Sequence, residues 1–557
     1  MLKGCTPWPA EFARRYRDAG YWEGLNLWGV LVRVIDRWPD KIALVHGARR
    51  MTYAELGAAS TALAVQLLNE GLRPLDRAVV QLPNGIDFVV AFFALLRIGV
   101  IPVPALPAHR RVEIDHFVGH SGAVAYLVAD RMRDFDYRPM AVEIAARRPA
   151  LRHVLVLGEP GPGQTSLAAM MRAAAPRDAE ALLAPHAPAA DEVAVMLLSG
   201  GTTGLSKLIP RTHDDYAYNA RQSASVAGFG PETVFLAVLP LGHNYSLASP
   251  GILGALFHGG TAVIAEGAAP EAVFSLIERE RVTVISAAVP LLVNWLNAGE
   301  SARHDLGSLK VLMNGGARLA PELRRRAEAR FKCTYQESYG TGEGLLCMTR
   351  LGDSDVERFN SSGLPVSADD EIRVVDDSGR ELPDGEPGQL LCRGPYTMRG
   401  YYDNPEATRA AFTADGFYRM GDAVRKIGRR IYFEGRINDL VNRGGEKISC
   451  EEVENHILAH RGVRAACVVA MPDAVYGEKA CAFVLPQPGA ALTFEELSAF
   501  LAGRGIARFK LPERLEIVAE FPISPAGKIL RRELRRMITD KIAAEKAARP
   551  GAPGPVQ

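Results

Sequence analysis

Short runs of β-branched and apolar residues alternate with amphipathic helical patterns over most of residues 1–430, and this alternation constrains the fold most strongly. Such alternation is typical of parallel sheets that helices cover on both faces. Helices are predicted over 53–69 and 270–280, and the second begins with Pro270, which suits a first helical turn. The sequence therefore predicts an α/β fold with strands at 42–46, 78–82, 123–129, 153–157, 193–198, 234–239, 261–265, 282–287 and 310–313.

The pattern changes after about residue 365. Short strands between Gly, Asp and Pro turns predict a small β-rich subdomain, with strands at 371–375, 388–392 and 430–433. From residue 436 the pattern is α+β, with helices at 451–460, 494–503 and from 529, and strands at 465–469 and 480–484. We therefore expect a large domain over 1–435, a small α+β domain over 436–545 and a disordered tail over 546–557. The Ala-, Pro- and Gly-rich segment 160–188 is expected to be an irregular surface excursion.

Composition excludes several classes of protein. Apolar residues make up 48% and charged residues 23%, which are globular values. The 65 basic and 64 acidic residues nearly cancel, so broad electrostatic binding to nucleic acid or to a membrane is not expected. The most apolar stretch, 88–104, is interrupted by Arg97 and two prolines, which predicts a buried helix followed by a strand. Seven cysteines without C-x-x-C spacing, and an N-terminus without an apolar leader segment, favour a reducing cytoplasm over a disulfide framework or a cysteine zinc site.

A glycine- and hydroxyl-rich loop follows the predicted strand 193–198 directly, with the sequence S-G-G-T-T-G-L-S-K. Backbone N–H groups and hydroxyls at a strand end can face a polyphosphate, and a lysine adds positive charge. The spacing does not match the Walker loop of P-loop NTPases. The sequence therefore predicts a phosphate-binding loop of another kind, formed by Ser199, Gly200, Gly201, Thr202, Thr203, Gly204 and Lys207.

This loop resembles the phosphate-loop signature of the adenylate-forming superfamily, which comprises acyl-CoA synthetases, nonribosomal adenylation domains and luciferases. Further segments resemble that superfamily's motifs in the same order, over nearly the whole chain. They are Y-G-T-G-E at 339–343, Y-R-M-G-D at 418–422, G-R-I-N-D at 435–439, R-G-G-E-K-I at 443–448 and P-I-S-P-A-G-K at 522–528. The resemblance implies an enzyme that uses ATP and Mg²⁺ to activate a carboxylic acid as its acyl-AMP.

That reaction brings a carboxylate to the α-phosphorus of ATP, so the site needs cations and fixed hydrogen-bond donors. Glu343 is expected to bind Mg²⁺, because this ion prefers one or two carboxylates together with phosphate oxygens. Tyr339 offers a flat face to adenine, and Asp422 can accept hydrogen bonds from the ribose hydroxyls. The resemblance implies that ATP and AMP also contact Gly315, Gly316, Ala317, Gly340, Thr341, Arg436 and Lys528, besides the loop.

The resemblance implies catalytic roles for Lys528, Thr341 and His243. A lysine at position 528 can neutralise the charge that develops at the α-phosphate. Asn438 and Asp439 are expected to form a hinge about which the domain 436–545 rotates. The turn that contains Gly445 and Lys447 would then face a thiol that takes the acyl group. The thiol is that of a phosphopantetheine on an aryl carrier protein, or of CoA, and the acceptor acts in trans.

The segment 242–251, G-H-N-Y-S-L-A-S-P-G, predicts the identity of the acid. It resembles the acyl pocket of stand-alone aryl-acid ligases of siderophore pathways, as do the N-terminal residues 8–17 and 20–22. A serine at 249 in that subfamily accompanies 2,3-dihydroxybenzoate, whereas a leucine at 346 accompanies salicylate, so the two positions disagree and we prefer the dihydroxy acid slightly. The pocket is predicted to include His243, Asn244, Tyr245, Ser249, Gly315 and Leu346.

Two departures from that subfamily leave alternatives open. The segment 339–343 looks more like that of aryl-CoA ligases, and Asn438 occupies a hinge position that is usually Lys or Asp. One alternative is therefore a salicylate- or benzoate-CoA ligase of aromatic catabolism. Another is a non-catalytic nucleotide- or aryl-acid-binding protein, although Lys528, Glu343 and Asp422 argue against it. We expect a monomer or homodimer that binds neither nucleic acid nor membrane.

Overall fold

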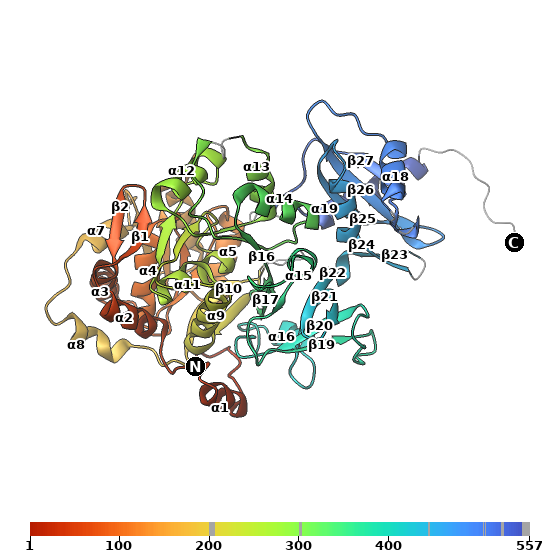
Figure 1. Cartoon of the computed structure of the whole chain (residues 1–557). Helices are drawn as coiled ribbons and strands as arrows, with labels where there is room; N and C mark the ends of the chain where they lie inside the picture. Colours follow the sequence, from red (N-terminus) through yellow and green to blue (C-terminus); the bar gives the residue numbers. More distant parts are fainter. Residues whose placement is uncertain are drawn as a thin grey trace. The chain divides into compact units, whose positions relative to one another are not determined.

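The computed structural model describes residues 1–199, 206–299, 303–443, 446–504, 506, 508–524 and 529–547 (Figure 1). Internal contacts divide the chain into two compact units. The first comprises Met1–Arg373, Leu391–Met420 and Gly428–Ile431, and the second comprises Val374–Leu390, Gly421–Ile427 and Tyr432–Gln557.

The larger sheet of the first unit has nine strands in the order β18-β17-β16-β15-β14-β12-β13-β1-β2. The strands from β16 to β1 in this order are parallel, and the remaining pairs at the two edges are antiparallel. The bounds are β1 (Ile42–His46), β2 (Arg49–Thr52), β12 (Val234–Ala237), β13 (Thr261–Ile264), β14 (Val284–Ala287), β15 (Val311–Gly315), β16 (Thr334–Thr341), β17 (Gly344–Met348) and β18 (Leu364–Pro365).

A smaller sheet of five parallel strands has the order β4-β3-β5-β8-β9. Its strands are β3 (Arg77–Gln81), β4 (Ile101–Pro104), β5 (Ala125–Ala129), β8 (His153–Leu157) and β9 (Thr165–Ser166). The prediction of an α/β fold with parallel sheets is thus confirmed. The predicted strand 193–198 is present as β10 (Val193–Leu198), but it pairs with β11 (Leu208–Thr212) as an antiparallel hairpin and belongs to neither parallel sheet.

Helices of the first unit follow local capping signals. Helix α3 (Tyr53–Glu70) begins at a capping box between Thr52 and Glu55 and ends at Gly71, whose φ is +107°. Helix α4 (Ile86–Arg97) is buried along its whole length except at Asp87, as expected of the apolar stretch that precedes strand β4. The others are α1 (Ala10–Asp18), α2 (Leu27–Arg37), α5 (Arg111–Ser121), α6 (Arg138–Arg147), α7 (Leu167–Arg172), α8 (Ala179–Leu183), α9 (His213–Val226), α10 (Asn244–Ala248), α11 (Gly251–Phe257), α12 (Pro270–Glu280), α13 (Val289–Asn297), α14 (Pro321–Phe331), α15 (Asp355–Asn360) and α16 (Pro405–Ala411).

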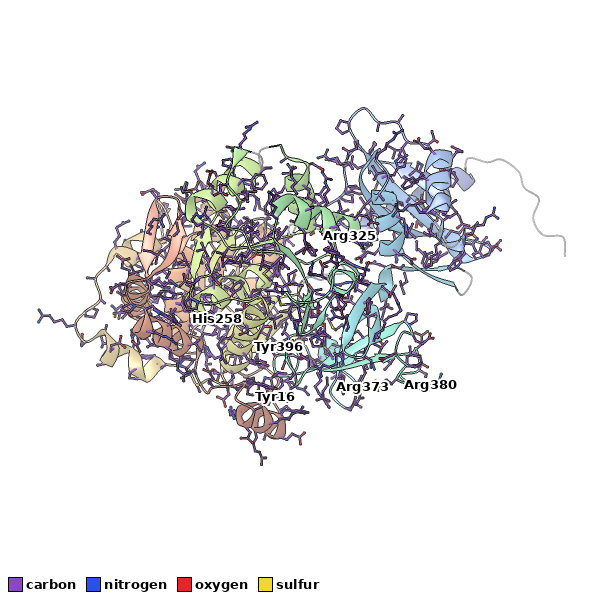
Figure 2. The ribbon with its side chains drawn as sticks, in the orientation of Figure 1. Tyr16, His258, Arg325, Arg373, Arg380 and Tyr396 are labelled. Carbon is purple, nitrogen blue, oxygen red and sulfur yellow. The ribbon has the colours of Figure 1, made fainter. Side chains whose placement is uncertain are left out.

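The N-terminal segment packs through aromatic rings. Tyr16, labelled in Figure 2, is fully buried, and its ring centroid lies 5.8 Å from that of Trp8 and 5.2 Å from that of Trp22. The indole nitrogen of Trp22 donates to the carbonyl of Pro395 at 3.0 Å. These contacts attach α1 to the body of the first unit, because buried aromatic pairs contribute beyond their buried area.

The prediction that residues 160–188 form an irregular excursion is wrong in part. The segment contains the short strand β9 and the helices α7 and α8. Ser166 caps α7 by accepting a hydrogen bond from the N–H of Ala169 at 3.1 Å. Among the helices in the described ranges, none combines the length and the apolar character that crossing a bilayer requires.

The predicted β-rich segment forms β19 (Glu371–Val375), β20 (Gly388–Arg393), β21 (Tyr418–Ile427) and β22 (Arg430–Arg436), a sheet through which the boundary between the units passes. The second unit has its own sheet, in the order β24-β23-β26-β25 with β27 beside β26. Its elements are β23 (Leu440–Arg443), β24 (Glu446–Ser449), α17 (Cys450–Leu458), β25 (Val463–Asp473), β26 (Gly477–Pro486), α18 (Phe494–Gly503), β27 (Arg514–Ile517) and α19 (Arg531–Ala547). The expected tail lies outside the described residues from 548 onward.

Candidate active site

The predicted phosphate loop connects the two strands of the β10–β11 hairpin. The N–H of Ser199 donates to the carbonyl of Lys207 at 2.9 Å, and the N–H of Lys207 donates to the Ser199 hydroxyl at 2.9 Å. Gly200, Gly201, Thr202, Thr203 and Gly204 lie outside the described residues. The two hydrogen bonds hold both ends of the loop at one point, immediately after an apolar strand.

Glu343 lies in the turn between β16 and β17, close to the end of this loop. Its side chain is buried, and Oε1 accepts a hydrogen bond from the Tyr401 hydroxyl at 3.0 Å. The Lys207 ammonium lies 4.2 Å from the centroid of the Tyr401 ring. Burial raises the pKa of the Tyr401 hydroxyl, which therefore stays protonated and donates to the carboxylate. Tyr401 thus joins the lysine of the phosphate loop to the predicted magnesium ligand, a contact that the sequence analysis missed.

The segment 339–343 is held by the antiparallel pairing of β16 with β17. Gly340 lies opposite Leu346, and a Cβ at Gly340 would come within 2.4 Å of the carbonyl oxygen of Leu345. The Thr341 hydroxyl donates to the carbonyl of Gly344 at 3.0 Å, and Tyr339 is half-buried opposite Cys347. Only glycine fits at position 340, so this backbone lies directly against the pocket position 346.

Gly315 ends strand β15, and the predicted nucleotide turn Gly316–Ala317 follows it. A Cβ at Gly315 would lie 2.7 Å from the ring of Tyr245, so this ring rests on the bare backbone. The side-chain amide of Asn314 donates to the carbonyl of Ala317 at 2.8 Å and holds the turn. The structure therefore places a predicted acid-pocket residue, Tyr245, against the predicted nucleotide turn.

Helix α10 carries the remaining predicted pocket residues. His243 caps it, with Nδ1 accepting a hydrogen bond from the N–H of Tyr245 at 3.2 Å. The side-chain amide of Asn244 donates to the Ser249 hydroxyl at 3.3 Å. Leu346 is buried on β17, and its Cδ1 would lie 3.1 Å from a Cβ at Gly340. Two residues of the predicted pocket, Asn244 and Ser249, are thus in contact.

Two side chains of α9 that the sequence analysis missed contact this pair. The Tyr216 hydroxyl donates to Asn244 Oδ1 at 2.8 Å, and the Asn219 amide donates to the Ser249 hydroxyl at 3.3 Å. Both side chains are buried. The sequence could have indicated them, because two polar residues spaced three apart in a helix lie on the same helix face.

The predicted ribose residues lie in the second unit. Asp422 on β21 is buried, and its Oδ1 lies 3.3 Å from Nε of Arg436 at the end of β22. The predicted hinge lies in the short 3-10 helix Ile437–Asp439, where Asp439 Oδ2 is 3.7 Å from Nε of Arg531. The side chains of Asn438 and Lys447 and all of Gly445 and Lys528 lie outside the described residues. Arg436 and Asp422 are therefore brought together, whereas residues 525–528 of the lysine motif, Lys528 among them, lie outside the described residues.

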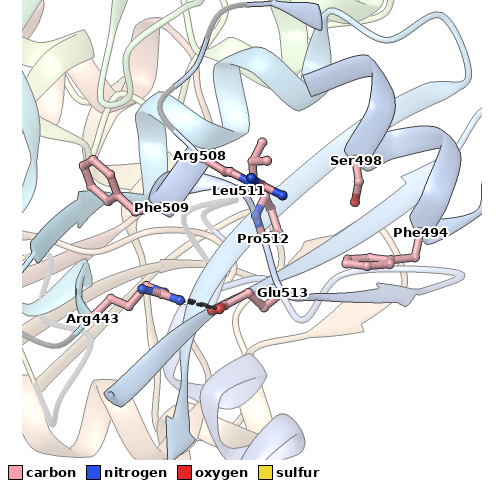
Figure 3. Close-up of a pocket in the computed structure, with 8 residues that line it drawn as sticks. All are labelled: Arg443, Phe494, Ser498, Arg508, Phe509, Leu511, Pro512 and Glu513. Atoms are coloured by element: carbon pink, nitrogen blue, oxygen red, sulfur yellow. Dashed lines mark hydrogen bonds and ion pairs between the residues drawn. The ribbon is translucent and has the colours of Figure 1, made fainter. Parts of the chain in front are cut away.

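The second unit contains a groove of about 530 Å³ (Figure 3). Arg443 lines the groove and pairs with Glu513 at 2.9 Å. The rest of the lining is largely apolar, with the aromatic rings of Phe494 and Phe509. The groove thus combines apolar side chains with two arginines and Glu513.

The residues that surround Glu343 fit a magnesium ion that is shared with phosphate. The carboxylate is buried and accepts one hydrogen bond from Tyr401, which leaves lone pairs on both oxygens. Among the described residues no cluster of three or more His, Cys, Asp or Glu side chains forms a metal site. A single carboxylate suits Mg²⁺, which is commonly held by one or two carboxylates and by substrate phosphates.

Comparisons with known proteins show the family to which the chain belongs. Residues 31–402 match the family model of AMP-binding enzymes, and residues 452–528 match that of their C-terminal domain. The chain is 45% identical to 2,3-dihydroxybenzoate-AMP ligase of Bacillus subtilis (strain 168) over 545 residues, 98% of this chain and 99% of that one. It is 42% identical to the salicyl-AMP ligase / salicyl-S-ArCP synthetase of Mycobacterium tuberculosis over 548 residues, 96% and 95% of the two chains.

Solved structures with a similar fold cover nearly the whole chain. The apo structure of MbtA from Mycobacterium smegmatis has a TM-score of 0.73 at 41% identity and covers 96% of this chain and 98% of its own. The anthranilate CoA ligase AuaEII in complex with anthranoyl-AMP has a TM-score of 0.84 at 25% identity, with coverages of 94% and 98%.

Proposed function

The chain belongs to the family of AMP-binding enzymes, and on this basis we propose that it activates a 2-hydroxylated aromatic acid as its aryl-AMP and transfers the aryl group to a thiol. The acid is 2,3-dihydroxybenzoate or salicylate. The observation that carries the proposal is the contact between Asn244 and Ser249, which lies beside a ring, Tyr245, that rests on the strand end leading into the predicted nucleotide turn. Relatives named for both acids match the chain over nearly its whole length.

The first step forms a bond between a carboxylate oxygen and the α-phosphorus of ATP, and pyrophosphate leaves. Both reactants are anions, so their approach requires positive charge and aligned donors. Lys528 supplies charge at the α-phosphate, while Lys207 and the hydroxyls of the loop 199–207 hold the leaving phosphates. Asp422 and Arg436 bind the ribose, and Gly315, Gly316, Ala317, Tyr339 and Gly340 hold the base.

Glu343 and its partner Tyr401 would hold Mg²⁺ against the phosphates. When bound, the ion offsets the charge of the phosphate oxygens. The Tyr401 hydroxyl donates to one carboxylate oxygen and so keeps the other turned away from it. Thr341, whose hydroxyl bonds within the same turn, keeps the backbone that carries Glu343 in place.

In the second step the thiol gives up its proton to solvent and its sulfur attacks the carbonyl carbon of the aryl-AMP. The bond between that carbon and the phosphate oxygen breaks, and AMP leaves with the electron pair of that bond. We propose that the unit containing α17–α19 turns about Asn438 and Asp439, which withdraws Lys528 and brings the turn with Gly445 and Lys447 toward the thiol. The acceptor is the phosphopantetheine of an aryl carrier protein, and the mycobacterial relative is named a salicyl-S-ArCP synthetase. ATP consumption and the free cysteines suit the cytoplasm.

Acid-dependent exchange of pyrophosphate into ATP tests the first step. Strong exchange with 2,3-dihydroxybenzoate or salicylate, but not with benzoate, is the expected result, and Lys528→Ala should lower it by orders of magnitude. Absence of exchange with every aromatic acid would overturn the proposal and return the binding-protein alternative.

A second candidate is an aryl-CoA ligase, because a Streptomyces relative named salicylyl-CoA synthase / salicylate adenylyltransferase is 45% identical over 98% of this chain. Supplying CoA or a phosphopantetheinylated aryl carrier protein to the preformed aryl-AMP distinguishes the two. Faster release of AMP with the carrier protein supports the proposal, and faster release with CoA supports the alternative.

A further inference from the structure

The Ser249 hydroxyl accepts two hydrogen bonds in this structure. The side-chain amide nitrogens of Asn219 and Asn244 each lie 3.3 Å from Oγ. A hydroxyl has two acceptor sites and one donor, so both acceptor sites of Ser249 are filled by protein. Its own hydrogen is the only hydrogen-bonding capacity that remains for a ligand.

Each amide has a further hydrogen-bond partner, and for Asn219 that partner fixes the orientation. The Asn219 nitrogen also donates to the carbonyl oxygen of Ala248 at 2.6 Å, and a carbonyl can only accept, so the nitrogen of Asn219 faces Ser249. The Tyr216 hydroxyl donates to Asn244 Oδ1 at 2.8 Å, and the nitrogen of that amide faces Ser249. Tyr216 and Asn219 lie one helical turn apart on α9, so one helix face contacts both Asn244 and Ser249.

Burial makes this arrangement costly to change. Ser249 is 6% exposed, Asn219 is 3% exposed and Tyr216 is fully buried. A buried polar group that loses its partner pays the full cost of its desolvation, so the bonds from Tyr216 to Asn244 and from Asn219 and Asn244 to Ser249 are kept. The Ser249 hydroxyl is therefore a preset donor and cannot rotate freely between donor and acceptor roles.

We propose that Asn219 is a specificity-determining residue, because by filling an acceptor site of Ser249 it makes the pocket select an acid whose 3-substituent accepts a hydrogen bond. This rests on the proposed function. In 2,3-dihydroxybenzoate the 2-hydroxyl donates to the carboxylate and the 3-hydroxyl donates to the 2-oxygen, which leaves the 3-oxygen as an acceptor. In 3-aminosalicylate the ring amine presents N–H donors, and its lone pair is delocalised into the ring.

The test measures kcat/KM of pyrophosphate exchange for 2,3-dihydroxybenzoate and for 3-aminosalicylate, each divided by the same variant's value for salicylate. The wild-type protein should prefer the 3-hydroxyl over the 3-amine by at least about tenfold, the size expected of one buried hydrogen bond. Asn219→Ala frees one acceptor site of Ser249, and the preference should then fall about tenfold. Asn219→Leu keeps the side-chain volume but lacks the amide. It should show the same fall in preference, and it serves as the second variant if Asn219→Ala folds poorly.

Ser223→Ala is the matched control. Ser223 is buried one turn further along α9, and its hydroxyl donates to the carbonyl of Asn219 without contacting Ser249. This variant should keep the wild-type preference.

Equal use of the two acids by the wild-type protein would overturn the inference and would indicate that Ser249 donates to Asn244 instead. An unchanged preference in both Asn219 variants would also overturn it. Exchange with none of the three acids would overturn the proposed function as well, so the two failures are distinguishable.

Discussion

The two parallel sheets of the first unit are built alike, but they treat polar groups at their strand ends differently. In the smaller sheet, Gln81 ends β3 and is fully buried. Its amide nitrogen donates to the carbonyls of Leu106 and His109 at 2.8 and 3.0 Å, and its oxygen accepts from the Tyr126 hydroxyl. In the larger sheet, the chain after β12 continues into helix α10, and Ser249 at the end of that helix is inferred to keep its hydrogen for a ligand. The edge of a parallel sheet is therefore a suitable place for a binding site. A site forms there only where a polar side chain keeps a hydrogen-bonding group that protein partners do not use.

Filling the space at the end of β15 should have the largest effect. Gly315→Ala places a Cβ 2.7 Å from the Tyr245 ring and displaces a wall of the proposed pocket. We expect pyrophosphate exchange to fall about a hundredfold, because small misplacements in an active site have effects of this size. Gly85→Ala is the control in the loop after β3, where the nearest atom, in His46, would lie 3.4 Å from the new Cβ and φ is extended. Full activity of the Gly315 variant would show that this strand end is not the site.

Removing the polar group of the smaller sheet should change stability and leave activity alone. Gln81→Leu leaves two carbonyls and the Tyr126 hydroxyl without their partner, at about 1–3 kcal/mol for each buried group. Urea unfolding should show this loss, while the KM for the aromatic acid stays as in the wild type. Tyr126→Phe removes only one of the bonds and should cost less. A raised KM in the Gln81 variant would mean that the smaller sheet also contributes to the site.

A buried carboxyl beside the edge of the larger sheet should give the smallest effect, and one that depends on pH. Tyr396 (Figure 2) donates to Asp370 at 2.5 Å and receives the N–H of Leu346 at 3.1 Å. Burial raises the pKa of Asp370 to about 7. Its folded-state pKa lies above the unfolded value of about 3.9, so the free energy of unfolding decreases as pH rises from about 4 to 7 and is constant above that range.

Asp370→Asn removes this titration. Relative to the variant, the wild-type protein should lose about 1 kcal/mol of stability per pH unit, or about 2 kcal/mol between pH 5 and 7. Urea unfolding at a series of pH values measures the difference. A difference independent of pH would show that the carboxyl keeps one protonation state throughout.

Much of the fold was predictable because its signals are local. The bounds predicted for β1, β8, β10, α12 and α18 are those observed, since apolar runs and capping residues mark them. The pairing of β10 with β11 was not predictable, because the sequence does not show that the chain turns back after the loop 199–207 and forms an antiparallel hairpin. The presence of helix α7 could have been predicted, because Ser166 is a capping residue directly before an apolar run.

Site residues that belong to a sequence motif were predictable. Site residues that reach the motif only through packing of other elements were not. His243, Asn244 and Ser249 follow one another in sequence, and the structure places the latter two in contact. Tyr216, Asn219 and Tyr401 lie on other elements, and their contacts with the predicted residues arise only when the chain has folded. Periodicity assigns a residue to a helix face, but not the partner that the face meets.

The protonation of the seven cysteines matters in a protein proposed to form an aryl-AMP, which is a reactive mixed anhydride. All seven lie in described ranges with free thiols, and burial raises the pKa of every one. Cys347 lies directly opposite Tyr339 and next to Leu346, yet its pKa is well above the ordinary value. Because a thiolate attacks a mixed anhydride far faster than a thiol does, we expect none of these cysteines to compete with an external thiol for an aryl-AMP.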